Sequence, residues 1–423
     1  MLTAITGINW GDEGKGRMVD LLAEEQDIVV RYQGGNNAGH TVVNDRGKFI
    51  LNLLPSGILR PDIVNIMATG MAIDLQHLAG ELQRLRDAGV TVSPENLKIS
   101  DKAIICMPYN VAQDGLEEKR LKDAKFGSTM RGIGPIYGDK YLKKALRIGD
   151  LLDPDYLRQR LAGILEWKNL TIEGVYNSEP FDYQQMLGWL EQYGEPILPH
   201  ICDISSYLRQ AVADNKKIMF EAQLGALRDI DYGIYPFTSS SSTLAAYAPI
   251  GAGLPGLKLD RVMGVMKAYS SCVGEGPFIA EMFGDEAEAL RAAGNEYGAA
   301  TGRPRRVGGF DMVASRYGTL MQGATELALT KIDVLSALDQ IPVIVAYEAD
   351  GERFTDFTTG GRLNRARPVI EYQPGWKRDI SGCRKLSDLP REARSYVQLL
   401  EDAVQCPISY ISVGPERDAF IPV

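Results

Sequence analysis

The sequence lacks the segments that mark a secreted or membrane-spanning chain. No basic stretch followed by an apolar one stands at its start, and no apolar run approaches ~18 residues. The five cysteines are scattered, form no C-x-x-C pair and are odd in number. Because this pattern fits reduced thiols best, we expect a cytoplasmic protein with no membrane partner.

An excess of basic side chains is also absent. The chain has 46 Lys and Arg residues and 55 Asp and Glu residues, for a net charge of -9. This charge argues against general electrostatic binding to nucleic acid. Any phosphate group must therefore be bound locally. Hydrophobic residues at 45% and charged residues at 24% are ordinary for a protein that buries a sizeable core. No linker of useful length interrupts the chain, so we predict a single domain over residues 1–423.

Short β-like runs bounded by Gly or Pro alternate with segments of helical periodicity. The runs cover residues 2–8, 27–35, 63–70, 217–225, 341–351 and 407–416. This alternation predicts an α/β fold with a mainly parallel central sheet flanked by helices. Between Pro154 and Lys217, amphipathic segments follow one another with no strong strand among them, which predicts a helical insertion over about residues 151–217.

The stretch "NWGDEGKGR" (residues 9–17) joins the first strand-like run to a helix expected to begin near Lys15. In such a turn, backbone N–H groups and the helix N-terminus hold phosphate. A standard P-loop reads G-x-x-x-x-G-K-[ST]. Here one residue too many separates Gly7 from Gly14, and Gly16 stands where the magnesium-binding hydroxyl belongs. Asp12 could supply an oxygen to magnesium instead, or act as a base. Taken alone, the stretch also fits a solvated acidic turn.

A second cluster, "RYQGGNNAGHT" (residues 31–41), follows the next strand-like run, where sheets of this class present their ligand-binding loops. His40, between glycine-flanked turns, is placed to donate a hydrogen bond to a developing oxyanion or a phosphoryl oxygen. A lone histidine is more often structural, and we interpret His77 and His200 in that way.

Seven motifs in order identify the chain as similar to adenylosuccinate synthetases. They are "WGDEGKGR", "RYQGGNNAGHT", "STMRGIGPIYGDK", "DIDYGIYPF", "GNEYGAATGRPRRVGGFD", "TKIDVL" and "SVGPERD". The resemblance runs from about Leu2 to about Asp418. It implies a parallel-sheet relative of the P-loop NTPases that acts as a homodimer. It also implies a ligase of purine biosynthesis, which spends GTP to join L-aspartate to C6 of inosine monophosphate (IMP) and gives adenylosuccinate.

The resemblance also implies roles for individual residues. Asp12 would take the N1 proton of the purine while it coordinates Mg²⁺, and the backbone carbonyl of Gly39 would complete the metal shell. His40 would assist transfer of the γ-phosphate to the 6-oxygen, and Lys15 would neutralise phosphate charge. The implied GTP contacts are Gly11, Glu13, Gly14, Gly16, Arg17, Thr41, Arg305, Lys331, Asp333, Ser412 and Gly414. The implied substrate contacts are Asn37, Thr129, Lys143, Leu224, Ser239, Thr301 and Arg303.

Chemistry supports two of these groups. A carboxylate such as Asp333 accepts parallel hydrogen bonds from guanine N1–H and its 2-amino group, which adenine cannot offer. The alternative is that Asp333 only stands at the end of a strand and forms an ordinary surface ion pair. In "ATGRPRR" (residues 300–306), planar guanidinium groups suit bidentate contact with carboxylate and phosphate. By resemblance, this loop closes on aspartate, with Arg305 reaching toward GTP and aspartate.

Several positions depart from the family pattern around the purine. Leu224 stands where a glutamine hydrogen-bonds the base, and Gln223 is one position off, so that only a bulge would restore the contact. Lys143 replaces an arginine that reaches the nucleotide phosphate from the partner subunit, which keeps the charge but loses the bidentate fork. The remaining departures are Ser239 and Ala300 for threonines, Asn36 for histidine, Asn9 for glutamine and Cys272 for arginine.

Three functions are therefore compared. The first is a ligase that acts on IMP, and the second is a paralogue that attaches aspartate to another 6-oxopurine nucleotide, such as a guanine nucleotide. The third is a non-catalytic GTP-binding protein. Asp12 and His40 are both present, and neither is needed merely to hold GTP, which argues against the third. The presence of Asp12 also weakens the guanine-nucleotide alternative, because phage relatives that use deoxyguanylate usually lack this aspartate.

Overall fold

The computed structural model describes residues 1–44, 47–298, 302 and 304–423. Its helices are α1 (Lys15–Leu22), α2 (Leu75–Asp87), α3 (Pro108–Leu121), α4 (Ile133–Tyr141), α5 (Pro154–Tyr176), α6 (Tyr183–Gly194), α7 (Ile204–Ala213), α8 (Ala248–Ala252), α9 (Asp285–Ala293), α10 (Met312–Gln322), α11 (Gly360–Arg365) and α12 (Arg391–Val404). None of the helices in this described part is long and apolar enough to cross a membrane.

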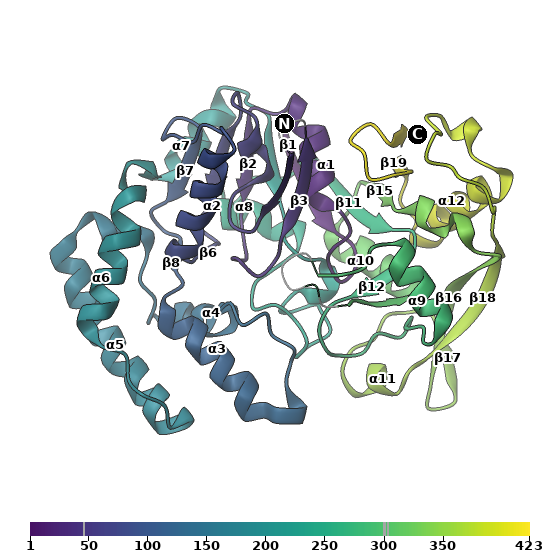
Figure 1. The fold of residues 1–423 in the computed structure, drawn as a ribbon. Coiled ribbons are helices and arrows are strands. Elements are labelled where there is room, and N and C mark those ends of the chain that lie inside the picture. The colour runs from purple at the N-terminus through teal and green to yellow at the C-terminus, as the bar shows by residue number, and fades with distance from the viewer. Residues whose placement is uncertain (45–46, 299–301, 303) are drawn as a thin grey trace.

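A large sheet runs through the centre of the molecule (Figure 1). In spatial order its strands are β20 (Phe420–Pro422), β19 (Ile408–Ser412), β15 (Glu326–Thr330), β11 (Arg261–Lys267), β1 (Leu2–Gly7), β10 (Ile218–Glu221), β2 (Ile28–Arg31), β5 (Val64–Met67), β7 (Leu97–Ser100) and β9 (Ile201–Cys202). All neighbouring pairs are parallel except β19 with β20. This confirms the predicted α/β fold with a mainly parallel sheet.

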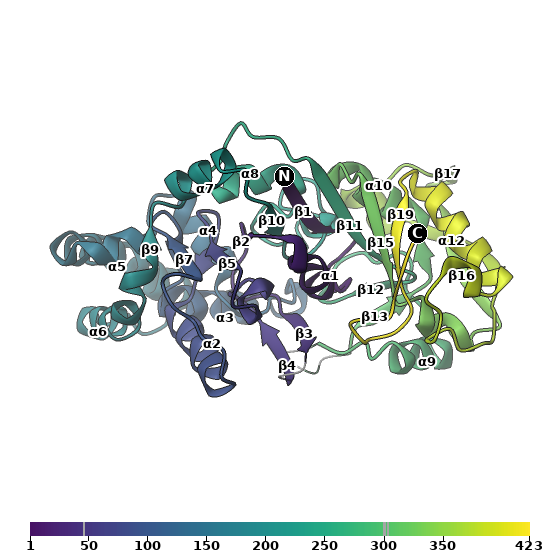
Figure 2. The ribbon, with the colours of Figure 1, turned by 90° about the horizontal axis from the view of Figure 1, so that it is seen from above.

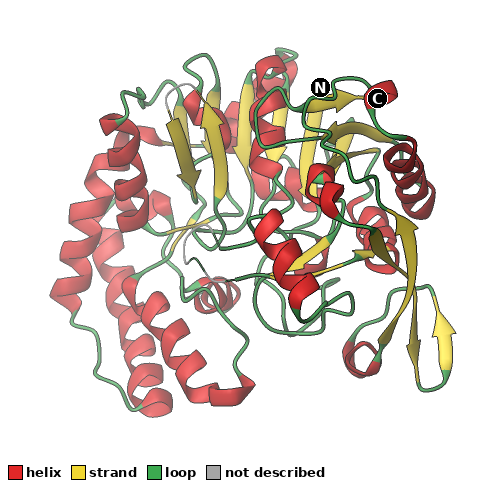
Figure 3. Cartoon of the chain, turned by 45° about the vertical axis from the view of Figure 1, so that its right-hand side comes forward, coloured by secondary structure: helices red, strands yellow, loops and turns green. Residues whose placement is uncertain are grey.

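Helices cover both faces of this sheet, as the view from above and an oblique view show (Figures 2 and 3). Every residue of β1 is buried, as expected for a parallel strand covered on both sides. Ala4 packs with residues of α7 and α8, whereas its neighbour Ile5 packs with Met18 and Val19 of α1. The alternation of side chains along a strand thus supplies two separate cores from one continuous apolar run.

The predicted helical insertion is only partly separate from the sheet. Helices α5 and α6 stand at one end of the molecule (Figure 1), where they pack beside α2 and α3. However, residues 201–202 form β9, the edge strand beside β7, and α7 covers the sheet. The sequence showed no strong strand here because a two-residue strand is too short to produce a periodic signal. That residues 1–423 form one domain stays a prediction.

The remaining strands lie outside the central sheet. They are β3 (His40–Asn44), β4 (Gly47–Leu51), β6 (Ala72–Ile73), β8 (Ile104–Ile105), β12 (Ser270–Cys272), β13 (Arg306–Gly308), β14 (Phe310–Asp311), β16 (Gln340–Ala349), β17 (Glu352–Phe354) and β18 (Arg367–Pro374). The apolar run at 341–351 thus belongs to a second sheet, with β14, β17 and β18 around β16. A local apolar run predicts a strand but does not say which sheet it joins.

Candidate active site

The loop between β1 and α1 is braced by a carboxylate of its own. Glu13 Oε1 accepts hydrogen bonds from the backbone N–H of Gly11 at 2.8 Å and of Asn9 at 3.2 Å. Its other oxygen lies 2.6 Å from Lys15 Nζ, and both side chains are buried. Glu13 therefore shapes the loop through hydrogen bonds within it, and Lys15 has Glu13 as its partner in this structure. Helix α1 begins at Lys15, as predicted.

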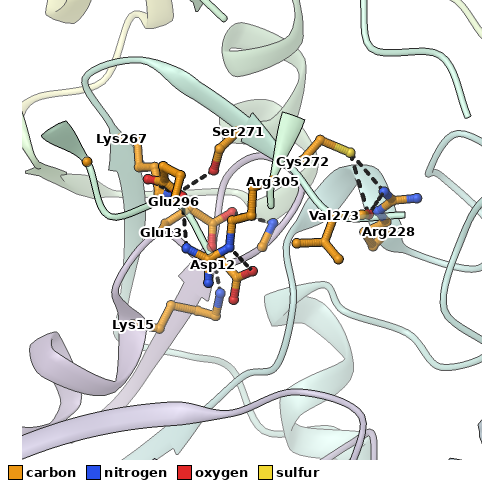
Figure 4. Close-up of polar contacts among 12 residues, drawn as sticks. Asp12, Glu13, Lys15, Arg228, Lys267, Ser271, Cys272, Val273, Glu296 and Arg305 are labelled. Carbon is orange, nitrogen blue, oxygen red and sulfur yellow. Dashed lines mark hydrogen bonds and ion pairs between the residues drawn. The ribbon is translucent and has the colours of Figure 1, made fainter. Parts of the chain in front are cut away.

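Asp12 lies at the exposed side of this loop. Its backbone has a φ of 60°, between glycines with φ of 105° and 94°, which is the left-handed region that gives a tight phosphate-binding turn its shape. The Asp12 side chain is 36% exposed, and its Oδ2 lies 3.1 Å from Arg305 Nε. This distance makes an ion pair, although Arg305 Nε forms no hydrogen bond within the described part of the chain. Figure 4 shows the pair beside Lys15.

His40 is the first residue of β3 rather than a loop residue. A Cβ added at Gly16 would lie 2.8 Å from the His40 Cβ, so the glycine allows α1 to approach this strand closely. His40 is buried, and its Nδ1 forms a short hydrogen bond with Glu221 Oε1. Burial lowers the pKa of His40 even though Glu221 opposes the shift. An ionised carboxylate can only accept, so Nδ1 carries the proton of this hydrogen bond.

Glu221 is a site residue that the sequence analysis missed. It ends β10 and is fully buried. Its carboxylate also accepts hydrogen bonds from the Ser56 backbone N–H at 2.8 Å and the Ser56 hydroxyl at 2.6 Å. Burial alone would raise the pKa of Glu221, but His40 and Arg31 outweigh it and lower the pKa to about 2. The sequence signal that could have identified Glu221 is a glutamate at the end of an otherwise apolar strand.

Arg17 lies among the residues that are expected to bind the guanine base, called here the guanine side. Its guanidinium donates to Ser412 Oγ at 2.7 Å and to the Gly414 carbonyl at 2.5 Å, and it lies over the Phe420 ring. Burial lowers the pKa of Arg17 to about 10, although Asp333 among its neighbours opposes this. The structure thus brings Arg17, Ser412, Gly414 and Asp333 together at the carboxyl ends of neighbouring strands β15 and β19.

The family model for "Adenylosuccinate synthetase" matches residues 4–421. The chain belongs to this family. A relative from Halothermothrix orenii named adenylosuccinate synthetase is 45% identical over 415 residues, which covers 98% of this chain and 96% of that protein. Adenylosuccinate synthetase 2 of Pseudoalteromonas translucida is also 45% identical, over 99% of this chain and 98% of its own length. The chain is therefore an enzyme, a GTP-dependent ligase that forms adenylosuccinate from IMP and aspartate.

Solved structures agree with this fold. The fully ligated adenylosuccinate synthetase of Plasmodium falciparum matches with a TM-score of 0.93 at 34% identity, covering 100% of this chain and 99% of that one. The succinoaminodeoxyadenylate synthetase of cyanophage S-2L, bound to dGMP and dATP, matches with a TM-score of 0.58 at 17% identity, over 100% of this chain and 95% of that one. At that identity the second likeness bears on the fold alone.

The purine side of this synthetase shows how the departures from the family pattern are accommodated. The Gln223 side chain donates to the Gly35 carbonyl at 2.7 Å and to the Asn52 carbonyl at 3.3 Å, and it is fully buried. Its amide nitrogen therefore holds the loop that follows β2, whereas its Oε1 is buried and has no hydrogen-bond partner among the described residues. Leu224 has a φ of 59° and is half-buried.

The other expected substrate residues are spread over several elements. The Ser239 hydroxyl oxygen is buried and has no hydrogen-bond partner, which fits a group that awaits a ligand. Asn37 Oδ1 accepts from the Gly35 backbone N–H at 3.2 Å, whereas Thr129 and Lys143 are exposed. Thr301 and Arg303 lie outside the described residues, as does Ala300.

Arg228, which the sequence analysis did not consider, contacts Cys272. The family pattern has an arginine at position 272. Arg228 Nη2 donates to the Cys272 sulfur at 2.9 Å and to the Val273 carbonyl at 2.5 Å, and Nη1 donates to the Phe237 carbonyl (Figure 4). The Arg228 carbonyl in turn accepts from the Ser239 backbone N–H at 2.9 Å. The positive charge absent from position 272 is therefore supplied by a neighbouring segment of the chain.

Proposed function

We propose that Asp12 removes the N1 proton of IMP, so that the 6-oxygen becomes nucleophilic and attacks the γ-phosphate of GTP, while the bond from the γ-phosphorus to the β-phosphate oxygen breaks and GDP leaves. The α-amine of aspartate then displaces this phosphate from C6, since phosphate leaves far more easily than a bare oxo group. The observation that carries the proposal is the exposed Asp12 carboxylate, held 3.1 Å from Arg305 Nε at the start of a helix suited to phosphate. A base must be open to its substrate, and a partner arginine keeps it oriented.

We propose that His40 donates a hydrogen bond to the transferred phosphoryl group from Nε2. Because Nδ1 is engaged by Glu221, an Nε2–H is present only when the ring carries a second proton. Glu221 favours this protonation, whereas burial opposes it. Negative charge that develops on the phosphoryl oxygens would favour the protonated imidazolium. The His40–Glu221 pair would therefore donate its hydrogen bond most strongly in the transition state.

We propose that GTP occupies the pocket formed by Asp333, Lys331, Ser412 and Gly414, with Gly11, Gly14, Gly16, Thr41 and Arg305 along its phosphates and Lys15 neutralising them. Burial raises the pKa of Asp333, although Lys331 and Arg17 oppose the shift. Where burial destabilises the ionised carboxylate, a ligand with two N–H donors stabilises it. Guanine provides two such donors. Glu13 and Arg17 contribute by shaping this pocket, as their contacts within the protein indicate.

We propose that Mg²⁺ binds at Asp12 and the Gly39 carbonyl, with phosphate oxygens of GTP completing its shell. No group of three or more His, Cys, Asp or Glu side chains able to hold a metal occurs in the described part of the chain. This fits magnesium, which commonly uses one or two protein oxygens together with substrate phosphates and water. When bound, the ion would supply positive charge to the phosphoryl group.

We propose a homodimer, within the cytoplasm, in which Lys143 reaches the IMP phosphate of the partner subunit. Lys143 is exposed and has a φ of 61° directly after α4, and the adjacent Tyr141 and Leu142 side chains are 78% and 60% exposed. Such exposed apolar residues beside a cation fit an interface that also touches a ligand. All five cysteines are free, which supports a reducing compartment.

The decisive experiment is a phosphate-release assay. Release from GTP should require IMP and aspartate together, and adenylosuccinate should accumulate in equal amount. Omission of either substrate should reduce release to background. If phosphate release from GTP stays the same when IMP or aspartate is omitted, the activity is that of a GTPase. That outcome would contradict the proposed reaction.

A further inference from the structure

A buried carboxylate outside the roles given above, that of Glu296, lies beside Lys267 and Arg305 (Figure 4). Glu296 is fully buried. Its Oε1 accepts hydrogen bonds from Lys267 at 2.9 Å and from Lys331 at 2.8 Å. Its Oε2 accepts one from Arg305 at 2.8 Å. Tyr269 Oη donates to Oε1 at 2.5 Å. One carboxylate thus satisfies four donors.

These donors come from segments that are far apart in the sequence. Lys267 ends β11, Lys331 directly follows β15, and Arg305 directly precedes β13. Glu296 itself stands shortly after α9. The carboxylate therefore joins the carboxyl ends of two central strands to the segment that carries Arg305.

The charges around Glu296 are unevenly balanced. Three cations, Lys267, Lys331 and Arg305, share the carboxylates of Glu296 and Asp12. Burial alone would raise the pKa of Glu296, but these three cations outweigh it and hold the pKa well below its usual range. Burial also lowers the pKa of Lys267 to about 8, although Glu296 opposes this. Glu296 is therefore ionised at neutral pH, and its removal would leave the buried Lys267 without its carboxylate beside the partly buried Lys331 and Arg305.

We infer that Glu296 is a positioning residue, which fixes Lys331 on the guanine side and Arg305 beside Asp12 through a single shared carboxylate. The inference rests on the proposed function, because it takes its meaning from the roles of Lys331, Arg305 and Asp12. A glutamine in this place would offer one acceptor oxygen and would turn two N–H donors toward the cations.

The test is Glu296→Gln. We expect kcat to fall about tenfold or more and KM for GTP to rise about tenfold, since each loss of about 1.4 kcal/mol is a factor of ten. KM for IMP should stay within about twofold, because neither Lys331 nor Arg305 is expected to contact IMP. A merely structural role would not separate the two KM values.

The matched control is Glu326→Gln. Glu326 pairs with Arg261 at the amino ends of β15 and β11, the same two strands whose carboxyl ends lead to Lys331 and Lys267. This variant also removes a carboxylate from an ion pair, but at the opposite edge of the sheet. It should lose stability while kcat and both KM values stay at the wild-type level. A shift in the KM for GTP as large as that of Glu296→Gln would overturn the inference.

The double variant Glu296→Gln/Lys267→Met separates positioning from charge balance. It removes one cation together with the carboxylate, so the net charge of the cluster returns to that of the wild type. We expect stability to recover and the kinetic defect to remain. Recovery of wild-type kinetics would mean that Glu296 only balances charge. Failure of both variants to fold would make Glu296 purely structural, and either outcome would overturn the inference.

The wild-type enzyme separates this inference from the proposed function. If wild-type phosphate release does not depend on IMP and aspartate, the proposed function fails first. If wild-type release depends on both and the Glu296→Gln variant keeps its kinetic constants within about twofold, the proposed function stands and the inference fails.

Discussion

Asp12 and Arg305 form an ion pair with 3.1 Å between Oδ2 and Nε, and the same guanidinium holds Glu296 through Nη1 at 2.8 Å. The proposed base is thus tied to the segment that the resemblance assigns to aspartate. The Asp12 side chain stays 36% exposed beside this arginine. The pair therefore joins the proposed base to the segment that carries Arg305.

Asp12→Asn tests the proposed base. We expect GTP affinity to remain within about fivefold and adenylosuccinate formation to vanish, because an amide cannot take a proton from the purine. The side chain is 36% exposed, so the free energy of unfolding should change by less than about 1 kcal/mol. Product formation and nucleotide binding are measured separately. Near-normal turnover would refute the assignment of the base.

Glu221→Gln tests the partner of His40. The folded-state pKa of Glu221 is lowered to about 2 from its ordinary value of 4.5, so its carboxylate contributes stability that is present above pH 4.5 and is lost as the pH falls toward 2. The contribution at pH 7 is on the order of 3 kcal/mol.

We expect the variant to be less stable than the wild type at pH 7, with a difference that narrows as the pH falls below 4.5. Urea unfolding at a series of pH values measures this difference. A gap that stays constant with pH would show that Glu221 acts through packing alone. In the same variant, kcat should fall because the imidazolium of His40 loses its counter-charge.

Leu224→Gln tests the departure at the purine. Leu224 has a φ of 59°, and leucine and glutamine carry a similar strain there, so the change mainly adds one polar group. A new hydrogen bond to the base is worth roughly 1 kcal/mol and should raise kcat/KM for IMP by about two- to tenfold. A panel of 6-oxopurine monophosphates at saturating aspartate gives the comparison.

The same panel decides between IMP and another 6-oxopurine for the wild type. If IMP is about a hundredfold poorer than another member, which corresponds to roughly 2.7 kcal/mol of transition-state binding, the assignment of IMP as the preferred substrate is wrong. An unchanged kcat/KM in Leu224→Gln would place the base away from this side chain.

Arg228→Leu tests the arginine that meets Cys272. Its guanidinium donates to the carbonyls of Val273 and Phe237 and to the Cys272 sulfur. Loss of these hydrogen bonds should cost about 1–3 kcal/mol, because one buried and two partly buried acceptors lose a charged donor. Thermal and urea unfolding measure this loss. Arg228→Leu/Cys272→Arg moves the charge back to position 272 and should regain part of the stability, and no recovery would show that the two positions are independent.

Lys143→Ala tests the proposed dimer. Lys143 is exposed, so stability should hardly change, whereas KM for IMP should rise about tenfold through loss of one charged contact to phosphate. Mixing Lys143→Ala with Asp12→Asn should restore some activity, because a mixed dimer contains one site with both residues intact. A mixture no more active than its components would contradict a site shared between subunits.

The sequence predicted those parts of the molecule that depend on local pattern. Apolar runs bounded by Gly or Pro located β1, β2, β5, β10 and β19, and the glycine-rich stretch located the turn before Lys15. Motif order gave the family and with it the expected residues. The same signals could not assign β16 to a second sheet or detect β9, because sheet membership depends on partners far away in the chain.

Sequence alone thus determined which groups are available: a carboxylate at Asp12, an imidazole at His40 and a second carboxylate at Asp333. Only the tertiary structure decided which partners restrain the charged groups. Glu221 meets His40, Glu296 gathers Lys267, Lys331 and Arg305, and Arg228 reaches Cys272. The physical reason is that a charge buried in a protein must find its partner through space. Those partners come from strands and loops whose separation along the chain carries no local signal.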